Sequence, residues 1–87
     1  MNYVEEKNTG NNNIKRYIEE FAKLNNIQIN NLEYGDVDGK IIYRFDVDKK
    51  GIRIEFDDEE IADCANDESV QRLLKGRVEN KIKSVMR

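Results

Sequence analysis

The chain has 87 residues and a formal net charge of −3 at neutral pH, and it contains no histidine, proline or tryptophan. A chain of this length forms one small domain, which buries only about 60–65% of the surface that its unfolded form exposes. The lack of histidine excludes histidine acid–base catalysis, Ser–His and Cys–His nucleophiles, and zinc sites with histidine ligands. A single cysteine, Cys64, cannot form an internal disulfide, and no apolar run reaches the ~20 residues of a membrane span, so we expect a cytoplasmic protein.

The first segment, residues 1–11, is polar and contains several asparagines and a glycine, which favours a flexible N-terminal arm before a folded domain of residues 12–87. Apolar residues then recur with the helical spacing i, i+3, i+4, i+7, and this pattern predicts a helix over residues 13–25. An asparagine just before the stripe is a suitable N-cap, and a pair of asparagines ends the helix. The stripe consists of Ile14, Tyr17, Ile18, Phe21, Ala22 and Leu24.

Three segments with alternating apolar and polar side chains follow, and they predict strands near residues 30–37, 40–47 and 52–56. Asp38-Gly39 fits a two-residue type I′ turn, because that turn needs positive φ at both central positions. A four-residue loop over 48–51 is expected between the second and third strands. The expected pairs are Tyr34–Tyr43, Leu32–Phe45 and Glu33–Arg44 in the first hairpin, and Val47–Ile52, Phe45–Ile54, Tyr43–Phe56, Asp46–Arg53 and Arg44–Glu55 in the second.

The stretch DVDKKGIRIEFD, residues 46–57, shares features with a calcium-binding EF-hand loop, with aspartates at positions 1, 3 and 12 and a glycine at position 6. An EF-hand loop follows a helix, however, whereas the residues before this stretch alternate with period two. Position 5 is Lys50 instead of Asp or Asn, and the apolar position 8 is Arg53. The sequence therefore predicts a β-hairpin here and no metal site.

Acids open the segment after the third strand, as a helix N-terminus prefers, and predict a short helix over residues 58–65. A longer helix is expected over residues 68–86, and its apolar side chains point in two directions about 100° apart. Either this helix bends at Gly76 and wraps the body, or its second half is an interface, most simply of a homodimer. The first apolar set is Val70, Leu73 and Leu74, and the second is Val78, Ile82, Val85 and Met86.

The predicted fold class is therefore α+β, with the order α-β-β-β-α-α and the helices packed on one face of a three-stranded antiparallel meander. One face of each strand and the apolar stripes of the helices would form the core. The expected core residues are Ile14, Ile18, Phe21, Leu32, Tyr34, Tyr43, Phe45, Val47, Ile52, Ile54, Phe56, Ile61, Val70, Leu73 and Leu74.

Charge is segregated along the second half of the chain. Residues 1–53 are balanced, residues 55–68 carry eight acids and no base, and residues 71–87 carry six bases against one acid. The acidic set is Glu55, Asp57, Asp58, Glu59, Glu60, Asp63, Asp67 and Glu68. The basic set is Arg72, Lys75, Arg77, Lys81, Lys83 and Arg87. An electrostatic function must use one of these two sets.

The acidic set is either a solvated face with helix-start acids or a surface that mimics the phosphate charge of DNA. Contiguous carboxylates disfavour a metal site, and no pair of acids is expected to face each other across a cleft. We therefore expect a small non-enzymatic protein without a cofactor, an inhibitor or regulator that binds a basic, nucleic-acid-handling partner protein. The alternative is a nucleic-acid-binding module that uses the basic C-terminal helix.

The element order, size and acidic surface are similar in outline to those of some phage anti-CRISPR proteins, without a shared motif. This similarity implies an inhibitor that acts against a bacterial defence enzyme. The order α-β-β-β-α also resembles the double-stranded RNA-binding domain, which contacts phosphates through lysines at the start of its last helix. The matching segment here, residues 57–68, is acidic, so RNA recognition of that kind is not expected.

Overall fold

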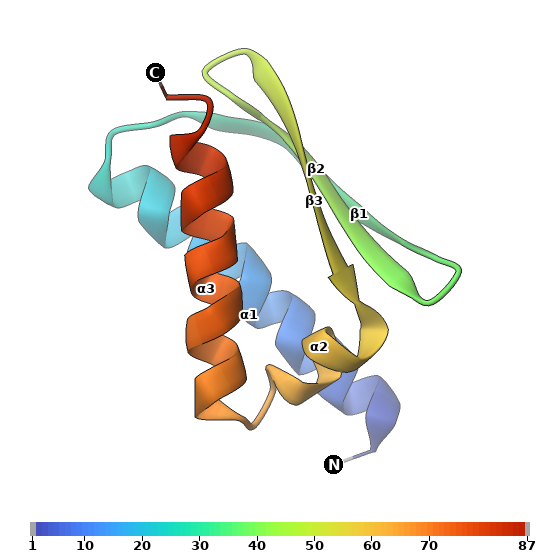
Figure 1. Ribbon diagram of the computed structural model, residues 1–87. Coiled ribbons are helices and arrows are strands. Elements are labelled where there is room, and N and C mark those ends of the chain that lie inside the picture. The colour runs from blue at the N-terminus through green and yellow to red at the C-terminus, as the bar shows by residue number, and fades with distance from the viewer. Residues whose placement is uncertain (1, 87) are drawn as a thin grey trace.

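A computed structural model describes residues 2–86 and confirms the α+β class and the predicted order of elements. The three strands form one antiparallel sheet in the order β1-β2-β3, and the helices lie on one face of it (Figure 1). The other face, called the outer face below, carries no helix. The elements are α1 (Tyr3–Leu24), β1 (Ile29–Val37), β2 (Lys40–Val47), β3 (Lys50–Asp57), α2 (Asp58–Asp63) and α3 (Glu68–Lys83). No helix within residues 2–86 is long and apolar enough to cross a membrane.

Helix α1 begins at Tyr3, so the prediction of a separate arm over residues 1–11 is wrong for the part that the structure describes. Asn2 caps the helix, because its Oδ1 accepts a hydrogen bond of 2.8 Å from the backbone N–H of Glu5. Two of the residues that suggested an arm, Gly10 and Asn11, are buried. A Cβ on Gly10 would lie 1.8 Å from the carbonyl oxygen of Ile61, so glycine permits close contact between α1 and α2.

The first hairpin has the predicted register over most of its length. Tyr34 faces Tyr43, Glu33 faces Arg44, and Asp38-Gly39 forms the turn with positive φ at both residues. The register shifts between Asn30 and Glu33, so the ladder is irregular at the position of the expected Leu32–Phe45 pair. Asn31, within this irregularity, has a φ of 58°.

The second hairpin forms, but its predicted register is wrong by two residues. Asp48-Lys49 makes a two-residue turn with φ values of 47° and 75°, and Phe45 consequently faces Ile52 instead of Ile54. Asp48 is held by Gln28 through two bonds of 3.1 Å, one to its backbone N–H and one to its side-chain oxygen. A shift of two residues keeps every side chain on its predicted face.

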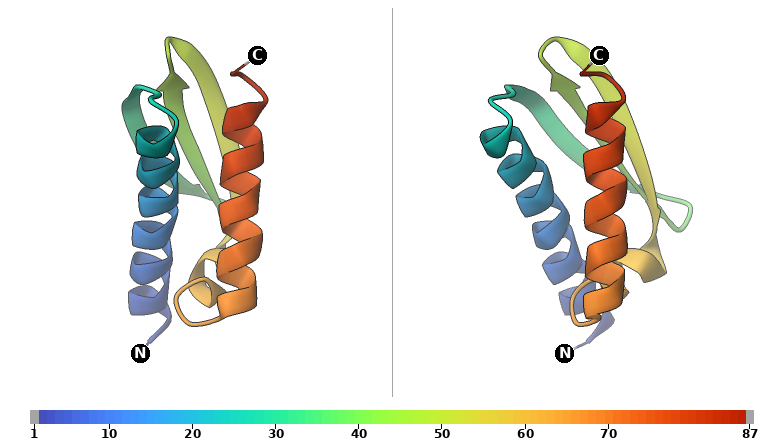
Figure 2. Two further views of the ribbon diagram at one scale, coloured as in Figure 1. Left: turned by 90° about the vertical axis from the view of Figure 1, so that its left-hand side faces the viewer. Right: turned by 60° about the vertical axis from the view of Figure 1, so that its left-hand side comes forward.

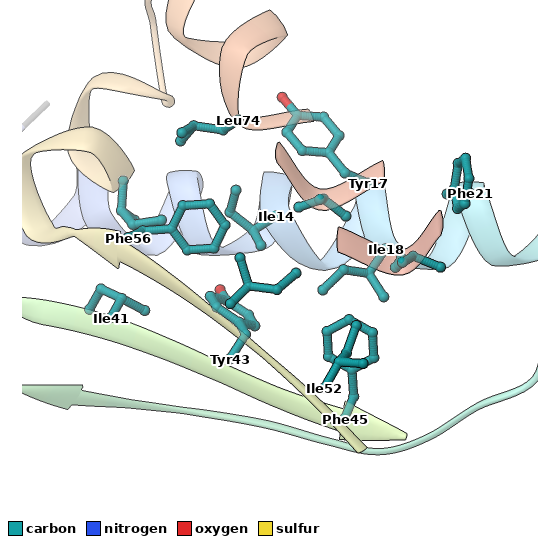
Figure 3. Packing of buried hydrophobic residues seen from close by; sticks show 14 of the residues in the cluster. Ile14, Tyr17, Ile18, Phe21, Ile41, Tyr43, Phe45, Ile52, Phe56 and Leu74 are labelled. Carbon is teal, nitrogen blue, oxygen red and sulfur yellow. The ribbon is translucent and has the colours of Figure 1, made fainter. Parts of the chain in front are cut away.

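The core lies between the sheet and the helix layer. Figure 3 shows side chains of α1, β2 and β3 pointing toward one another, with Leu74 of α3 above them. Tyr43 is fully buried, its ring is edge-on to Phe56 at 5.8 Å, and its hydroxyl donates a 2.6 Å hydrogen bond to Asn11 Oδ1. The buried hydrophobic residues are Ile14, Tyr17, Ile18, Phe21, Ala22, Ile41, Tyr43, Phe45, Val47, Ile52, Ile54, Phe56, Ile61, Ala62, Cys64, Leu74, Val78 and Ile82.

Four residues of the expected core are not fully buried. Leu73 and Tyr34 are exposed, with 60% and 40% of their surface accessible, whereas Leu32 and Val70 are half-buried against the core. Leu73 points away because α3 packs through the stripe Leu74, Val78 and Ile82, which repeats every four residues.

Helix α3 runs without interruption through Gly76 (Figures 1 and 2), so the expected bend is absent. The expected homodimer surface is also wrong in its central part, because Val78 and Ile82 are fully buried within this chain. Val85 is half-buried and Met86 is exposed. One continuous helix therefore buries Val78 and Ile82 of the second set together with Leu74 of the first set, and leaves Leu73 in solvent.

Candidate interaction surface at the acidic end

The three helices begin at the same end of the molecule, which is the lower end in Figures 1 and 2. Each helix has acids in its first turn, as helix N-termini favour. Two contacts tie these segments together: Asn66 Nδ2 lies 3.5 Å from Glu6 Oε2, and Lys7 Nζ lies 3.4 Å from Asp58 Oδ1. We call this region the acidic end. It comprises Glu5, Glu6, Asp57, Asp58, Glu59, Asp63, Asp67 and Glu68.

Six of the eight predicted acids belong to the acidic end, and two are bound to bases elsewhere. Glu55 lies on the outer face of the sheet, 2.5 Å from Arg53 and 4.0 Å from Lys40. Glu60 accepts two hydrogen bonds of 2.9 and 2.8 Å from Arg77, which hold the pKa of its carboxyl below the usual range. Neither carboxylate is a free charge for a partner.

Glu5 and Glu6 were missed by the sequence analysis. Both lie in the segment that was expected to be an arm, far in sequence from residues 55–68. The signal that could have found them is Asn2 followed by a glutamate three residues later, which is the pattern of a capped helix start. Their addition brings carboxylates from three separate segments of the chain to one end.

Two of the acids also cap helices. Asp67 Oδ1 accepts hydrogen bonds from the hydroxyl and backbone N–H of Ser69, at 2.7 and 2.9 Å, and from the backbone N–H of Val70, at 3.3 Å. These bonds hold the pKa of the Asp67 carboxyl below its usual value. Asp57 precedes α2, and its backbone N–H donates a 3.0 Å bond to Glu60 Oε1. The Asp67 cap therefore remains negatively charged at neutral pH.

Lys7 is the basic side chain that contacts this region. Its Nζ lies 2.6 Å from Asp36 Oδ2 and 3.4 Å from Asp58 Oδ1, and the hydrogen bond to Asp36 raises the pKa of Lys7 above its usual value. The Asp58 oxygen is buried, and its contact with Lys7 adds to the raised pKa of Lys7. Lys7 is thus shared between two carboxylates, and the region keeps a net negative charge.

One member of the predicted basic set is bound within the fold, and four others are exposed on α3. Arg77 is bound to Glu60, and its guanidinium carbon lies 5.3 Å from the centre of the Phe56 ring, so it serves the fold. The side chains of Arg72, Lys75, Lys81 and Lys83 are exposed. Arg87 lies outside the described residues.

The remaining candidate chemistry is sparse. Within residues 2–86, no three acidic or cysteine side chains are grouped in a way that could hold a metal ion. Cys64 is fully buried, with its Sγ 3.8 Å from the Tyr17 hydroxyl, and burial raises the pKa of its thiol. Asn13 and Gln71 donate hydrogen bonds to the carbonyl of the same residue at 3.0 and 2.9 Å, which places Cys64 in a structural junction between helices.

No protein-family model, no curated protein and no solved structure matches this chain.

Proposed function

We propose that this protein is a non-enzymatic interaction protein whose acidic end binds a basic surface on a nucleic-acid-handling protein and thereby inhibits or regulates it. The observation that carries the proposal is the gathering of carboxylates from α1, α2 and the start of α3 at one end of the molecule. Within residues 2–86, Glu59, Asp63 and Glu68 form no ion pair and are exposed.

Dense negative charge of this kind is the feature of nucleic acid that basic proteins recognise without regard to sequence. It also attracts a basic partner over distances comparable to the Debye length, and so raises the rate of association at low salt. The competing explanation is that these acids serve only the helix N-termini at which they stand. In that case they would stabilise the fold and bind nothing.

The proposal is tested with two variants of equal charge change. Glu59→Lys with Asp63→Lys reverses two charges of the acidic end, and Glu19→Lys with Glu20→Lys reverses two charges on the exposed side of α1. Each protein, and the wild type, is immobilised and exposed to a nuclease-treated bacterial lysate at low and high salt. Bound proteins are then identified by mass spectrometry.

We expect the wild type and the α1 variant to retain nucleic-acid-binding proteins, which added duplex DNA displaces, and the acidic-end variant to lose them. The loss of two charge contacts should weaken binding by about 10- to 100-fold at low salt. Equal retention by all three proteins would contradict the proposal.

The alternative function, direct nucleic-acid binding through the basic side of α3, is separated by a gel-shift titration with duplex DNA and RNA. We expect no shift at moderate salt. Tight, salt-sensitive binding would instead assign the function to Arg72, Lys75, Lys81 and Lys83 and would overturn the proposal.

A further inference from the structure

The edge strand β1 has no strand on the side away from β2 among the described residues, and its pairing with β2 is regular from Glu33 to Val37. It occupies one edge of the sheet, has nine residues, and none of them is buried. Figures 1 and 2 show the β1–β2 hairpin extending away from the helix layer. An edge strand of this length presents a row of backbone N–H and C=O groups that can pair with another extended chain.

Shallow hollows flank β1 on both faces of the sheet. The hollow on the helix side lies between β1 and the first half of α1 and is lined by Tyr3, Val4, Lys7, Asn8, Asn11, Tyr34, Asp36 and Ile41. The hollow on the outer face is lined by Glu33, Tyr34, Gly35, Val37, Ile42 and Arg44. Gly35 leaves the outer hollow open, since a Cβ there would meet nothing within 4 Å.

Exposed hydrophobic side chains concentrate at this edge. Seven large hydrophobic residues are exposed within the described part of the chain, and four of them line the two hollows. These four are Tyr3, Val4, Tyr34 and Val37, with exposed fractions of 49, 66, 40 and 53%. Single exposed hydrophobic residues need no explanation, but a group of them on both sides of an open strand edge favours an interaction there.

We propose that β1 accepts a fourth strand, an extended segment of the partner protein in which apolar residues alternate with lysine or arginine. The added backbone would pair with the free edge of β1, and alternate side chains would enter the hollows on the two faces. The inference rests on the proposed function for the basic character of the partner.

Charge indicates a basic segment rather than a second copy of this chain. Residues 29–38 contain three acids and no base. Asp36 is bound to Lys7 and Glu33 faces Arg44, whereas Asp38 forms no ion pair among the described residues. The helix-side hollow also adjoins the acidic end, because Tyr3 lines both this hollow and a separate depression formed with Asp57, Asp58 and Glu59. A second copy of β1 would add three acids and no base to an edge that adjoins the acidic end, whereas a basic segment would complement it.

The probe is a phage-displayed library of random twelve-residue peptides, selected on the immobilised wild-type protein. Selected peptides are synthesised, and their affinities are measured by fluorescence polarisation. We expect the selected sequences to alternate apolar residues with lysine or arginine. N-methylation of every second peptide nitrogen, on the side that faces β1, should abolish binding, because a methylated nitrogen cannot donate a hydrogen bond.

Two matched variants locate the site. Val4→Lys places a charge in the helix-side hollow, and Leu24→Lys makes the same change at the other end of α1, where 84% of the side chain is exposed. We expect Val4→Lys to weaken peptide binding at least tenfold and Leu24→Lys to leave it unchanged. Hydrogen exchange should show that alternate β1 amides become protected when the peptide binds.

Selected peptides without the period-two pattern, peptides unaffected by N-methylation, or no enrichment at all would overturn the fourth strand. If sedimentation equilibrium shows a dimer that Val4→Lys dissociates, the strand that pairs with β1 comes from a second copy of this chain, and the partner segment is overturned. If the capture of lysate proteins depends on Glu59 and Asp63 but not on Val4, the proposed function is retained and the fourth strand is overturned. If peptides bind at β1 but the capture of lysate proteins does not depend on Glu59 and Asp63, the fourth strand is retained and the proposed function is overturned.

Discussion

The two edge strands of the sheet pair with the same central strand but contribute very differently to the fold. Ile52, Ile54 and Phe56 of β3 are all buried, in strict alternation with exposed residues. No residue of β1 is buried, although β1 is one residue longer than β3. The helix layer causes this difference, because α2 and α3 pack against β3 and the β1 side of the sheet projects beyond them.

The contacts that hold the two edges also differ in kind. On the β3 side, Arg77 binds Glu60 through two hydrogen bonds and lies over the buried ring of Phe56. On the β1 side, Tyr34 stacks on Tyr43 with ring centres 4.9 Å apart, and Lys15 Nζ lies 4.8 Å from the Tyr34 ring centre. Such half-exposed ring contacts are worth about 0.5–1.5 kcal/mol each, less than a buried side chain.

The two edges differ in how many of their side chains the core uses and how many remain accessible to a partner. Strand β1 contributes only the half-buried side chains of Ile29 and Leu32 to the core, whereas β3 contributes three fully buried ones. The exposed hydrophobic residues beside β1 other than Tyr34, which are Tyr3, Val4 and Val37, are therefore not explained by burial in the core. They are free for binding, whereas equivalent positions of β3 are occupied by the helices.

The largest effect that tests the comparison is expected from truncating one aromatic ring on each edge. Phe56→Ala removes a ring that is 1% exposed and should cost about 3–5 kcal/mol of unfolding free energy. Tyr34→Ala removes a ring that is 40% exposed and should cost about 1–2 kcal/mol. Urea denaturation followed by circular dichroism measures both values. Equal losses would mean that β1 supports the core as much as β3 does.

A smaller effect is expected at the contact that sets the position of the helix layer. Gly10→Ala places a methyl group against the Ile61 carbonyl, and the shift of α1 away from α2 should cost about 1–3 kcal/mol. Gly76→Ala is the matched control, because a Cβ there meets nothing within 4 Å and alanine favours a helix interior by about 1 kcal/mol. In thermal denaturation we expect Gly10→Ala to lower the melting temperature and Gly76→Ala to raise it. A neutral Gly10→Ala would show that the two helices are not in close contact.

The two hairpin turns show why the sequence predicted one register and missed the other. Asp38-Gly39 contains the glycine that a turn with two positive φ values favours. The register of its hairpin was predicted correctly from the pair Glu33–Arg44 to the pair Val37–Lys40. Asp48-Lys49 adopts the same turn without glycine, and the nearby Gly51 directed the prediction to a longer loop. The bonds between Asp48 and Gln28, twenty residues apart, favour the observed turn and have no signal in local sequence.

The acidic end was predicted in part for a related reason. The acids of residues 57–68 stand out as a run, whereas Glu5 and Glu6 join them only because α1 extends to Tyr3. Gly10 and Asn11 are typical of a loop in sequence, yet both are buried by contacts with α2 and β2. Similarly, the helical wheel identified both apolar sets of α3, but only tertiary packing decides that Leu74, Val78 and Ile82 form the buried stripe.

The smallest expected effect concerns the ion pair on the β3 side, and it depends on pH. Arg77 lowers the pKa of Glu60 in the folded protein, so the folded state favours the ionised carboxylate more than the unfolded state does. The resulting stability is present above the ordinary glutamate pKa of about 4.3 and is lost as pH falls through the lowered folded value. Because the two side chains are 27 and 35% exposed, solvent screens the pair, and we expect less than about 1 kcal/mol.

Glu60→Gln tests this contribution, since glutamine can still accept the hydrogen bond from the Asp57 backbone but carries no charge. Wild type should be more stable than Glu60→Gln at pH 7, and the gap should close below about pH 4 as Glu60 protonates. The lowered pKa of Asp67 affects both proteins in the same pH range and cancels in the difference. Glu59→Gln is the matched control, because Glu59 is exposed and forms no ion pair within the described residues. A gap that persists unchanged at pH 3 would show that Glu60 acts through shape and hydrogen bonding, and that charge does not hold the β3 edge to α3.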